Sequence, residues 1–292
     1  MLDIVQNSIA RSIDDVLCIL NSEPETKIIA GGTDVLIKIR EGKIPHAKLV
    51  SIGAIPELKG TAIRDDGIIR IGPLSTFREL ESDQLVAQNI PIIAKAAMSV
   101  GGPQIRAVGT IGGNICNGAT SADTAPSLFT LNAKLVLMSK ERKRTVNIQD
   151  FYLEPGKVDL AYNEIMTDIL ISRDDYSGYC GYYYKYAMRN AMDISTIGCA
   201  VQVKLNENGR TVNDIRIAYG VAAPTPIRLT KAEEALRGKD YADVLELGPD
   251  LVRAEIKPRD SWRASKAFRE HIAGEIFKTS VYRALEGIAS SC

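Results

Sequence analysis

The chain has 292 residues, of which 45% are hydrophobic and 25% are charged, as is typical of a soluble globular protein with one large or two ordinary domains. Thirty-six basic residues balance thirty-six acidic residues, so no excess charge favours nucleic acid or a membrane surface as a partner. Asp3 stands where a signal peptide carries lysines, and no apolar run approaches the roughly 18 residues of a spanning helix. We therefore expect a cytoplasmic protein.

The cysteines and histidines do not predict a disulfide framework or a metal site. The five cysteines are widely spaced and include no C-x-x-C pair, whereas zinc and iron–sulfur sites usually take ligands from close pairs. Only two histidines are present, at His46 and His271. We expect no metal ligand and no catalytic side chain, and we assign any difficult chemistry to a bound cofactor.

The first third of the chain alternates helical and extended patterns. Ser12 is a candidate N-cap, followed by Asp14 and Asp15 in a first helical turn, and Pro91 suits the first turn of a later helix. In chain order, the patterns predict a helix over 12–21, a strand over 27–30, an apolar segment over 35–39, strands over 48–52 and 68–72, a helix from Ser75 or Thr76, and a helix over 91–100.

The rest of the chain predicts further strands and then a helical tail. Six of the eleven tyrosines fall between Tyr176 and Tyr186, and we place a domain boundary there, between residues 175 and 176. The patterns predict strands within 127–139, 144–151 and 164–172, strands over 195–205 and 214–223 paired through a turn at 206–209, and helices beyond residue 230. This mixture predicts an α+β fold.

Two glycine pairs are the main functional signal. "IIAGGTD" (28–34) and "GTIGGNI" (109–115) each place two glycines after an extended run and before a small polar residue. Glycine lets a ligand approach the main chain closely, and freed N–H groups form an anion-binding concavity. Two such segments together suit a diphosphate held from two sides without arginine.

The same glycine pairs also have an ordinary interpretation. Neither matches G-x-G-x-x-G or a P-loop, and a lone pair after a strand is typical of a tight turn. Asp34 would repel a phosphate, so its carboxylate is expected to point away or to cap a helix. Composition and spacing leave the two interpretations open.

Four longer segments resemble a known family: "AGGTD", "GGPQIRAVGTIGGNICNGATSADTAP", "KYAMRNAMDIS" and "SWRASKAFR". They are similar to the FAD-binding subunits of bacterial molybdenum hydroxylases, most closely the xanthine dehydrogenase branch. The resemblance implies an FAD-binding PCMH-type domain of two α/β subdomains over residues 1–175. It also implies a smaller α+β domain over 176–292, like the C-terminal domain of carbon monoxide dehydrogenase flavoproteins.

The resemblance also implies a set of FAD-binding residues. The first glycine segment would hold the diphosphate, and the second would meet it from the other subdomain. These residues are Lys27, Ile28, Ile29, Ala30, Gly31, Gly32, Thr33 and Asp34 in the first segment, and Thr110, Ile111, Gly112, Gly113 and Asn114 in the second.

Four further residues match family positions around the cofactor. Val100 stands where the family often has an aromatic residue near the flavin. Asp123 matches an aspartate on the sugar or adenine side, although it is also a candidate cap for a helix near Ala125. Met166 matches a main-chain contact to the adenine region, although methionine in a strand is also ordinary core. Lys185 matches a lysine near the flavin ring, on the strand face opposite Tyr182, Tyr184 and Tyr186, and a lone lysine there is otherwise solvated.

The implied activity is electron transfer within a larger enzyme. A molybdenum-cofactor subunit would hydroxylate a purine, a [2Fe-2S] subunit would pass the electrons on, and FAD on this chain would reduce NAD⁺, in a heterotrimer or its dimer. The chain lacks the cysteine-bearing insert of the benzoyl-CoA reductase relatives, so FAD is the only redox group expected.

Three alternatives stay open. The larger enzyme could be a related dehydrogenase that acts on nicotinate, an aldehyde or another heterocycle, and the electron acceptor could be oxygen or a ferredoxin-like carrier. The third alternative is a cofactor-free assembly protein with a tyrosine-rich interface.

Overall fold

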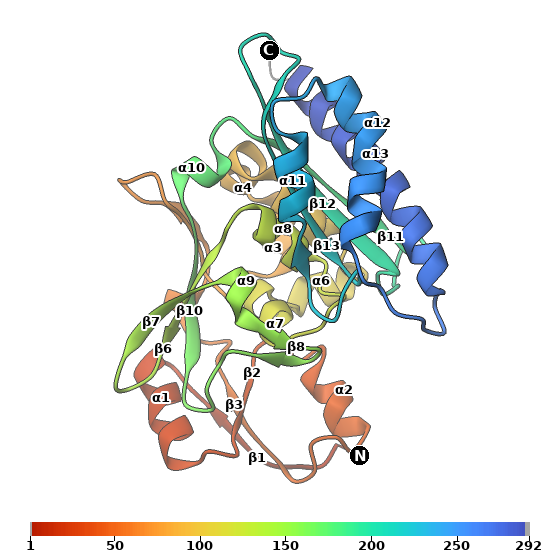
Figure 1. Ribbon diagram of the computed structural model, residues 1–292. Coiled ribbons are helices and arrows are strands. Elements are labelled where there is room, and N and C mark those ends of the chain that lie inside the picture. The colour runs from red at the N-terminus through yellow and green to blue at the C-terminus, as the bar shows by residue number, and fades with distance from the viewer. Residues whose placement is uncertain (1, 290–292) are drawn as a thin grey trace.

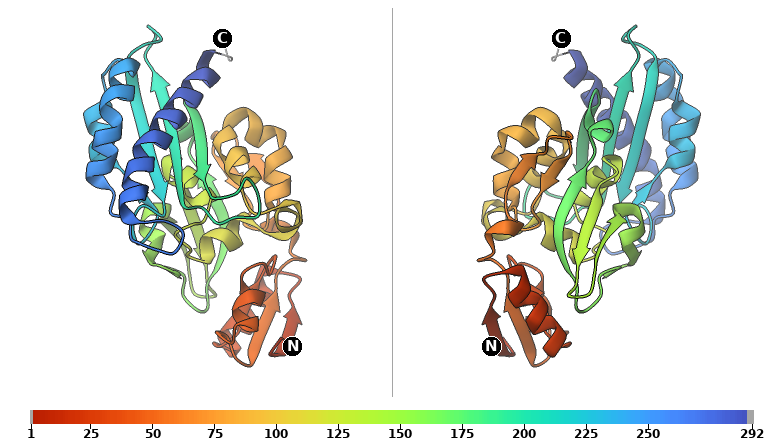
Figure 2. Two further views of the ribbon diagram at one scale, coloured as in Figure 1. Left: turned by 90° about the vertical axis from the view of Figure 1, so that its right-hand side faces the viewer. Right: turned by 90° about the vertical axis from the view of Figure 1, so that its left-hand side faces the viewer.

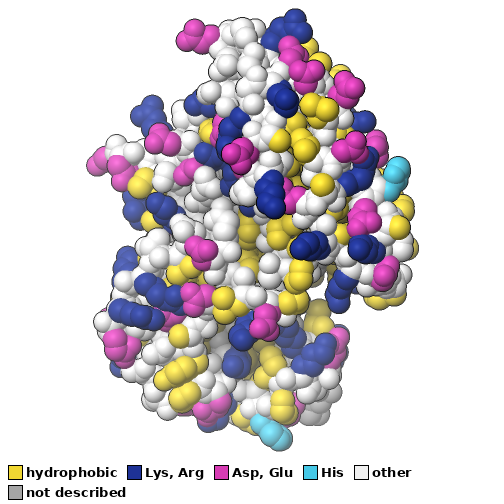
Figure 3. Space-filling model, viewed as in Figure 1, with side chains coloured by type: hydrophobic (Ala, Val, Ile, Leu, Met, Phe, Trp, Pro, Cys, Tyr) yellow, Lys and Arg dark blue, Asp and Glu magenta, His cyan; other side chains and the backbone are white. Residues whose placement is uncertain are grey.

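The structure, a computed structural model, describes residues 2–289 and consists of three successive units built on sheets (Figures 1 and 2). The N-terminal unit lies at one end, the central unit follows, and the C-terminal sheet with its helices lies at the other end (Figure 1). Basic and acidic side chains are interspersed on the face shown in Figure 3, in keeping with the balanced charge.

The N-terminal unit is a small parallel sheet with two helices. Its strands have the order β1-β3-β2, and Ser12 begins the first helix in a capping box with Asp15, as the sequence predicts. The apolar segment after the first glycine pair is a helix. The elements are β1 (Ile4–Ile9), α1 (Ile13–Ser22), β2 (Lys27–Ile29), α2 (Val35–Arg40) and β3 (Ala47–Ser51).

The central unit packs short helices against an antiparallel five-stranded sheet of order β4-β5-β10-β6-β7. Thr76 and Glu79 form a capping box at the start of α3, where the sequence predicts a helix. The elements are η1 (Pro56–Leu58), β4 (Thr61–Ile63), β5 (Ile69–Ile71), α3 (Phe77–Ser82), α4 (Gln84–Asn89), α5 (Pro91–Met98), α6 (Pro103–Val108), α7 (Ile111–Cys116), α8 (Thr124–Thr130), β6 (Lys134–Met138), β7 (Lys143–Asn147), α9 (Ile148–Phe151), β8 (Tyr152–Glu154), β9 (Lys157–Val158) and β10 (Ile165–Ile171).

The C-terminal unit is an antiparallel sheet of order β11-β12-β13-β14, covered on one face by its own helices (Figure 2). The other face packs on α5 and α8 of the central unit. The predicted pairing of two long strands through the turn at 206–209 is confirmed. The elements are α10 (Arg173–Tyr176), β11 (Cys180–Tyr186), β12 (Ile197–Leu205), β13 (Val212–Gly220), β14 (Ile227–Arg228), α11 (Thr230–Leu236), α12 (Tyr241–Glu255) and α13 (Lys266–Ala289).

Three local predictions are wrong. The segment 127–130, predicted as strand, belongs to helix α8, in which every residue is buried. The segment 148–151, predicted as the end of a strand, forms helix α9. The second glycine pair, predicted as a turn after an extended run, follows helix α6 and lies inside the first turn of α7. The expected domain boundary between residues 175 and 176 falls within α10, and it stays a prediction.

Candidate functional site

The loop between β2 and α2 presents a run of unused backbone donors. Among the described residues, no protein acceptor pairs with the N–H groups of residues 30–35. Gly32 has φ +74°, a conformation that favours glycine, and it turns the chain away from the strand. Asp34 is exposed, and its side chain makes no cap hydrogen bond, so the interpretation of Asp34 as a cap of α2 is wrong. A curved run of free donors of this kind suits an anionic ligand.

Gly31 brings the two glycine segments together. A Cβ at this position would lie 1.9 Å from the carbonyl oxygen of Val108 and 3.0 Å from Cα of Gly109. The main chain of the loop therefore lies directly against the junction of α6 and α7. Only glycine permits this approach, so here the residue is required by the packing of two segments that are far apart in sequence.

The second segment differs from the first, because its N–H groups are already paired. Ile111 N–H donates to the carbonyl of Ser75 and Gly112 N–H to that of Pro73, at 3.0 and 2.9 Å. The N–H groups of Gly113 and Asn114 donate to the hydroxyl and the carbonyl of the N-cap Thr110. The expectation that both segments supply bare N–H groups therefore holds only for residues 30–35.

The glycines of α7 have different tasks. A Cβ on Gly112 would lie 2.5 Å from Cβ of Pro73, so this residue is needed for packing. Gly113 is exposed, and the only neighbour of its Cβ would be the Thr110 hydroxyl at 2.9 Å. Because Gly113 has no side chain, the exposed backbone of α7 is accessible to a ligand at this position.

A lysine that the sequence did not single out also links the two segments. Nζ of Lys38, on α2, donates to Oδ1 of Asn117 at the end of α7, at 2.6 Å. The contact holds the helix after the first glycine pair against the helix that contains the second. No sequence pattern relates two residues 79 positions apart.

Asp123 and Lys185 form a buried ion pair. Nζ of Lys185 lies 2.8 Å from Oδ2 of Asp123 and 3.0 Å from the carbonyl oxygen of Ser99, and its side chain is only 12% exposed. The phenol of Tyr183 donates to Oδ1 of Asp123 at 2.9 Å. Asp123 stands at the N-cap position of α8 but makes no capping bond, so the capping interpretation is wrong. The interpretation of Lys185 as a solvated side chain is also wrong, because the side chain is buried and paired with Asp123.

Burial sets the electrostatics of this cluster. It raises the pKa of Asp123 above its ordinary value, while the charge of Lys185 and the bonds from Lys185 and Tyr183 act in the opposite direction. Burial, together with the charge of Asp123, raises the pKa of Tyr183 well above its ordinary value. Tyr183 therefore stays a neutral donor at neutral pH.

The two other predicted residues, Val100 and Met166, lie on different elements of the central unit. Val100 is half-buried next to Ser99, whose carbonyl accepts from Lys185. Met166 is buried on β10, with its main chain paired to Leu137 of β6 and a register shift just after it. The preceding Ile165 belongs to the core cluster of the N-terminal unit, so Met166 lies where the central and N-terminal units meet.

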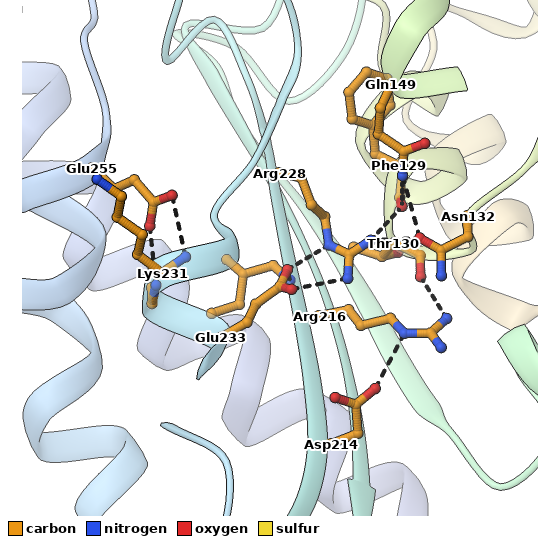
Figure 4. Close-up of polar contacts among 12 residues, drawn as sticks. Phe129, Thr130, Asn132, Gln149, Asp214, Arg216, Arg228, Lys231, Glu233 and Glu255 are labelled. Atoms are coloured by element: carbon orange, nitrogen blue, oxygen red, sulfur yellow. Dashed lines mark hydrogen bonds and ion pairs between the residues drawn. The ribbon is translucent and has the colours of Figure 1, made fainter. Parts of the chain in front are cut away.

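A separate hollow of about 690 Å³ lies between α8, β14 and α11, away from the glycine segments. Figure 4 shows Arg228, which lines the hollow and donates to Glu233 and to the carbonyl of Phe129. The same view shows Arg216, outside the lining of the hollow, which donates to the carbonyl of Thr130. Because these charges are already paired, we interpret the hollow as part of the joint between two units.

The described part of the chain contains neither a cluster of metal ligands nor a helix suited to a membrane. No group of three or more His, Cys, Asp or Glu side chains within residues 2–289 is arranged to hold a metal ion. Over the same range, no helix has both the length and the apolar character needed to cross a bilayer.

Comparison with known proteins assigns both parts of the chain. Residues 5–173 match the family described as FAD binding domain in molybdopterin dehydrogenase, and residues 182–284 match the CO dehydrogenase flavoprotein C-terminal domain. The xanthine dehydrogenase FAD-binding subunit of Escherichia coli O157:H7 is 40% identical over 98% of this chain and 97% of its own. The carbon monoxide dehydrogenase medium chain of Hydrogenophaga pseudoflava is 30% identical over 97% and 96%. A solved carbon monoxide dehydrogenase from Hydrogenophaga pseudoflava superposes with a TM-score of 0.91, at 28% identity over 97% of this chain and 98% of the matched one.

Proposed function

Because the chain belongs to the family of FAD-binding domains of molybdopterin dehydrogenases, we propose that it is the electron-transfer subunit of a xanthine dehydrogenase. In this proposal it receives electrons from [2Fe-2S] clusters on a partner chain and reduces NAD⁺. A molybdenum-cofactor subunit oxidises the purine. The xanthine assignment is supported by the 40% identity, compared with 29% to a nicotinate dehydrogenase subunit of Eubacterium barkeri.

The residues of the site fit FAD. The unpaired N–H groups of residues 30–35 match the diphosphate oxyanions, and Gly113 leaves room beside them on α7. Lys38 adds a positive charge between α2 and α7. FAD supplies the redox chemistry, since it accepts single electrons and releases a pair as hydride. The protein supplies the position and the surrounding charge.

The remaining site residues take roles along an extended cofactor. Asp123 and Lys185 are only 2.8 Å apart, so they act on one part of it. We therefore assign the pair to the flavin end, with Val100 nearby, in place of the expected position of Asp123 on the sugar or adenine side. The adenine side is left to the main chain of Met166. Lys185 then places a positive charge beside the ring, where it stabilises the negative charge of the reduced flavin. Asp123 and the Ser99 carbonyl hold that ammonium in place.

One observation carries the proposal: six successive unpaired N–H groups lie on a glycine loop that is packed against the start of a second glycine segment.

The test is purification of the native complex, with flavin, iron and molybdenum analysis and an assay of NADH formation. We expect bound FAD, two partner chains and NAD⁺ reduction with xanthine or hypoxanthine. NADH formation with nicotinate alone would assign the chain to a related dehydrogenase. Electron transfer only to oxygen or to a ferredoxin-like carrier would overturn the NAD⁺ assignment. A cytoplasmic location stays a prediction.

A further inference from the structure

Strand β11 separates its side chains between two environments. Tyr182, Tyr184 and Tyr186 pack against the core cluster of the C-terminal unit, as the alternation of the strand predicts. Tyr183 lies on the opposite face and belongs to the core cluster of the central unit. Lys185 shares that face and reaches Asp123 and Ser99. Tyr183 therefore differs from its tyrosine neighbours in facing the cofactor-binding part of the molecule.

The neighbouring strand makes room for the phenol of Tyr183. Gly198 on β12 is paired with Lys185, and a Cβ at Gly198 would lie 2.5 Å from the phenol oxygen of Tyr183. A glycine within a strand often marks such a close approach. The missing side chain lets the phenol lie against the backbone of the sheet and donate to Asp123 at 2.9 Å.

Asp123 is fixed at both of its oxygens. Oδ1 accepts from Tyr183 and Oδ2 accepts from Lys185, and neither oxygen caps α8. The carboxylate is 8% exposed, so among the described groups its orientation depends on these two donors. Removal of the phenol leaves the carboxylate held only through Lys185, so its orientation is less well fixed and it positions the ammonium less firmly.

We propose that Tyr183 is a positioning residue for the flavin: its phenol orients Asp123, and Asp123 keeps the Lys185 ammonium at one place beside the ring. The inference rests on the proposed function, which puts Lys185 at the flavin end. It concerns a residue that does not itself touch the cofactor. Its effect therefore depends on Lys185 and disappears when the ammonium is absent.

The test combines Tyr183→Phe with Lys185→Met and uses Tyr184→Phe as the matched control. The flavin midpoint potential of the FAD-loaded protein is the first measurement. We expect Tyr183→Phe to lower it in the same direction as Lys185→Met but by less, and to have no further effect in the double variant. Gly198→Ala, which displaces the phenol without removing it, is expected to reproduce the shift. A wild-type or raised potential in Tyr183→Phe, or an equal shift with and without Lys185, overturns the proposal.

The second measurement needs no cofactor. The rate at which an amine-reactive reagent labels Lys185 is followed by peptide mass spectrometry in the flavin-free protein. Tyr183→Phe is expected to raise that rate several-fold and Tyr184→Phe to leave it unchanged, whereas equal rates overturn the proposal. Failure of NAD⁺ reduction, with both measurements as expected, would contradict the proposed function and leave the role of Tyr183 intact.

Discussion

Lys185 and Asp123 lie 62 residues apart in the chain, and their charged atoms are 2.8 Å apart in a site shielded from solvent. Lys185 comes from β11 of the C-terminal sheet, and Asp123 stands at the start of α8 in the central unit. The pair therefore joins the two units. Removal of one partner leaves the other charge buried and without compensation. Such a change is strongly destabilising.

The first prediction concerns the charge of Lys185. In Lys185→Met, FAD stays bound, and the flavin midpoint potential falls because the reduced flavin loses a neighbouring positive charge. Spectroelectrochemical titration measures the potential. The control is Lys204→Met, whose ammonium lies over the ring of Tyr179 at 5.5 Å, toward the other end of the sheet. A midpoint equal to that of the wild type would exclude Lys185 from the flavin environment.

The second prediction concerns the contact between the two glycine segments. In Gly31→Ala, the new Cβ meets the Val108 carbonyl, so the loop must shift. We expect a loss of unfolding free energy of about 1 to 3 kcal/mol, the usual cost of overpacking, and a large loss of FAD affinity. Urea unfolding and flavin fluorescence measure the two effects. Gly53→Ala, which adds a Cβ with no neighbour within 4 Å, is the control. Wild-type affinity in Gly31→Ala would argue against this loop as the diphosphate site.

The third prediction separates ligand approach from packing on α7. Gly113→Val puts methyl groups on an exposed surface and disturbs only the Thr110 cap, at a cost of about 1 kcal/mol. We expect an unchanged circular dichroism spectrum and no retained FAD. Gly112→Val, in contrast, collides with Pro73 and is expected to destabilise the fold itself. FAD retained by the Gly113 variant would show that the cofactor does not pass this surface.

The fourth prediction concerns the ion pairs that precede Met166. Arg144 donates to both oxygens of the buried Glu164, at 2.7 Å each, and to Asp159. These hydrogen bonds hold the pKa of each carboxyl below its ordinary value. Carboxyls with a lowered pKa stabilise the fold above their unfolded-state values, and this stability is lost as the pH falls through the folded-state values.

Arg144→Met is therefore expected to lower the unfolding free energy at pH 7 by about 3 kcal/mol, as for a broken buried pair. Below about pH 4, the difference from the wild type is expected to shrink, because protonated carboxyls no longer attract Arg144. Urea titrations at several pH values measure this. A difference that is constant with pH would mean that Arg144 acts through packing alone.

Local patterns predicted much of the fold. Caps at Ser12 and Thr76, together with the alternation of apolar residues, placed several helices and the long strand pair β12–β13. Alternation along β11 correctly separated Lys185 from Tyr182, Tyr184 and Tyr186. These features depend on residues that are close in sequence.

Features fixed by packing were not predictable from the sequence. Helix α8 is buried on every side, so it lacks the polar face that reveals a helical period. The glycines of α7 suggest a turn, but the Thr110 cap and the contact with Pro73 hold them in a helix. The links from Tyr183 and Lys185 to Asp123 and from Lys38 to Asn117 join residues 60 or more positions apart, for which one sequence carries no signal.

The most direct test of residues 30–35 as the diphosphate site is a crystal structure of the protein with FAD bound. We predict diphosphate oxygens at about 2.9 Å from backbone nitrogens within residues 30–35, with Gly113 facing the cofactor. A diphosphate bound elsewhere, with those N–H groups facing only water, would contradict it.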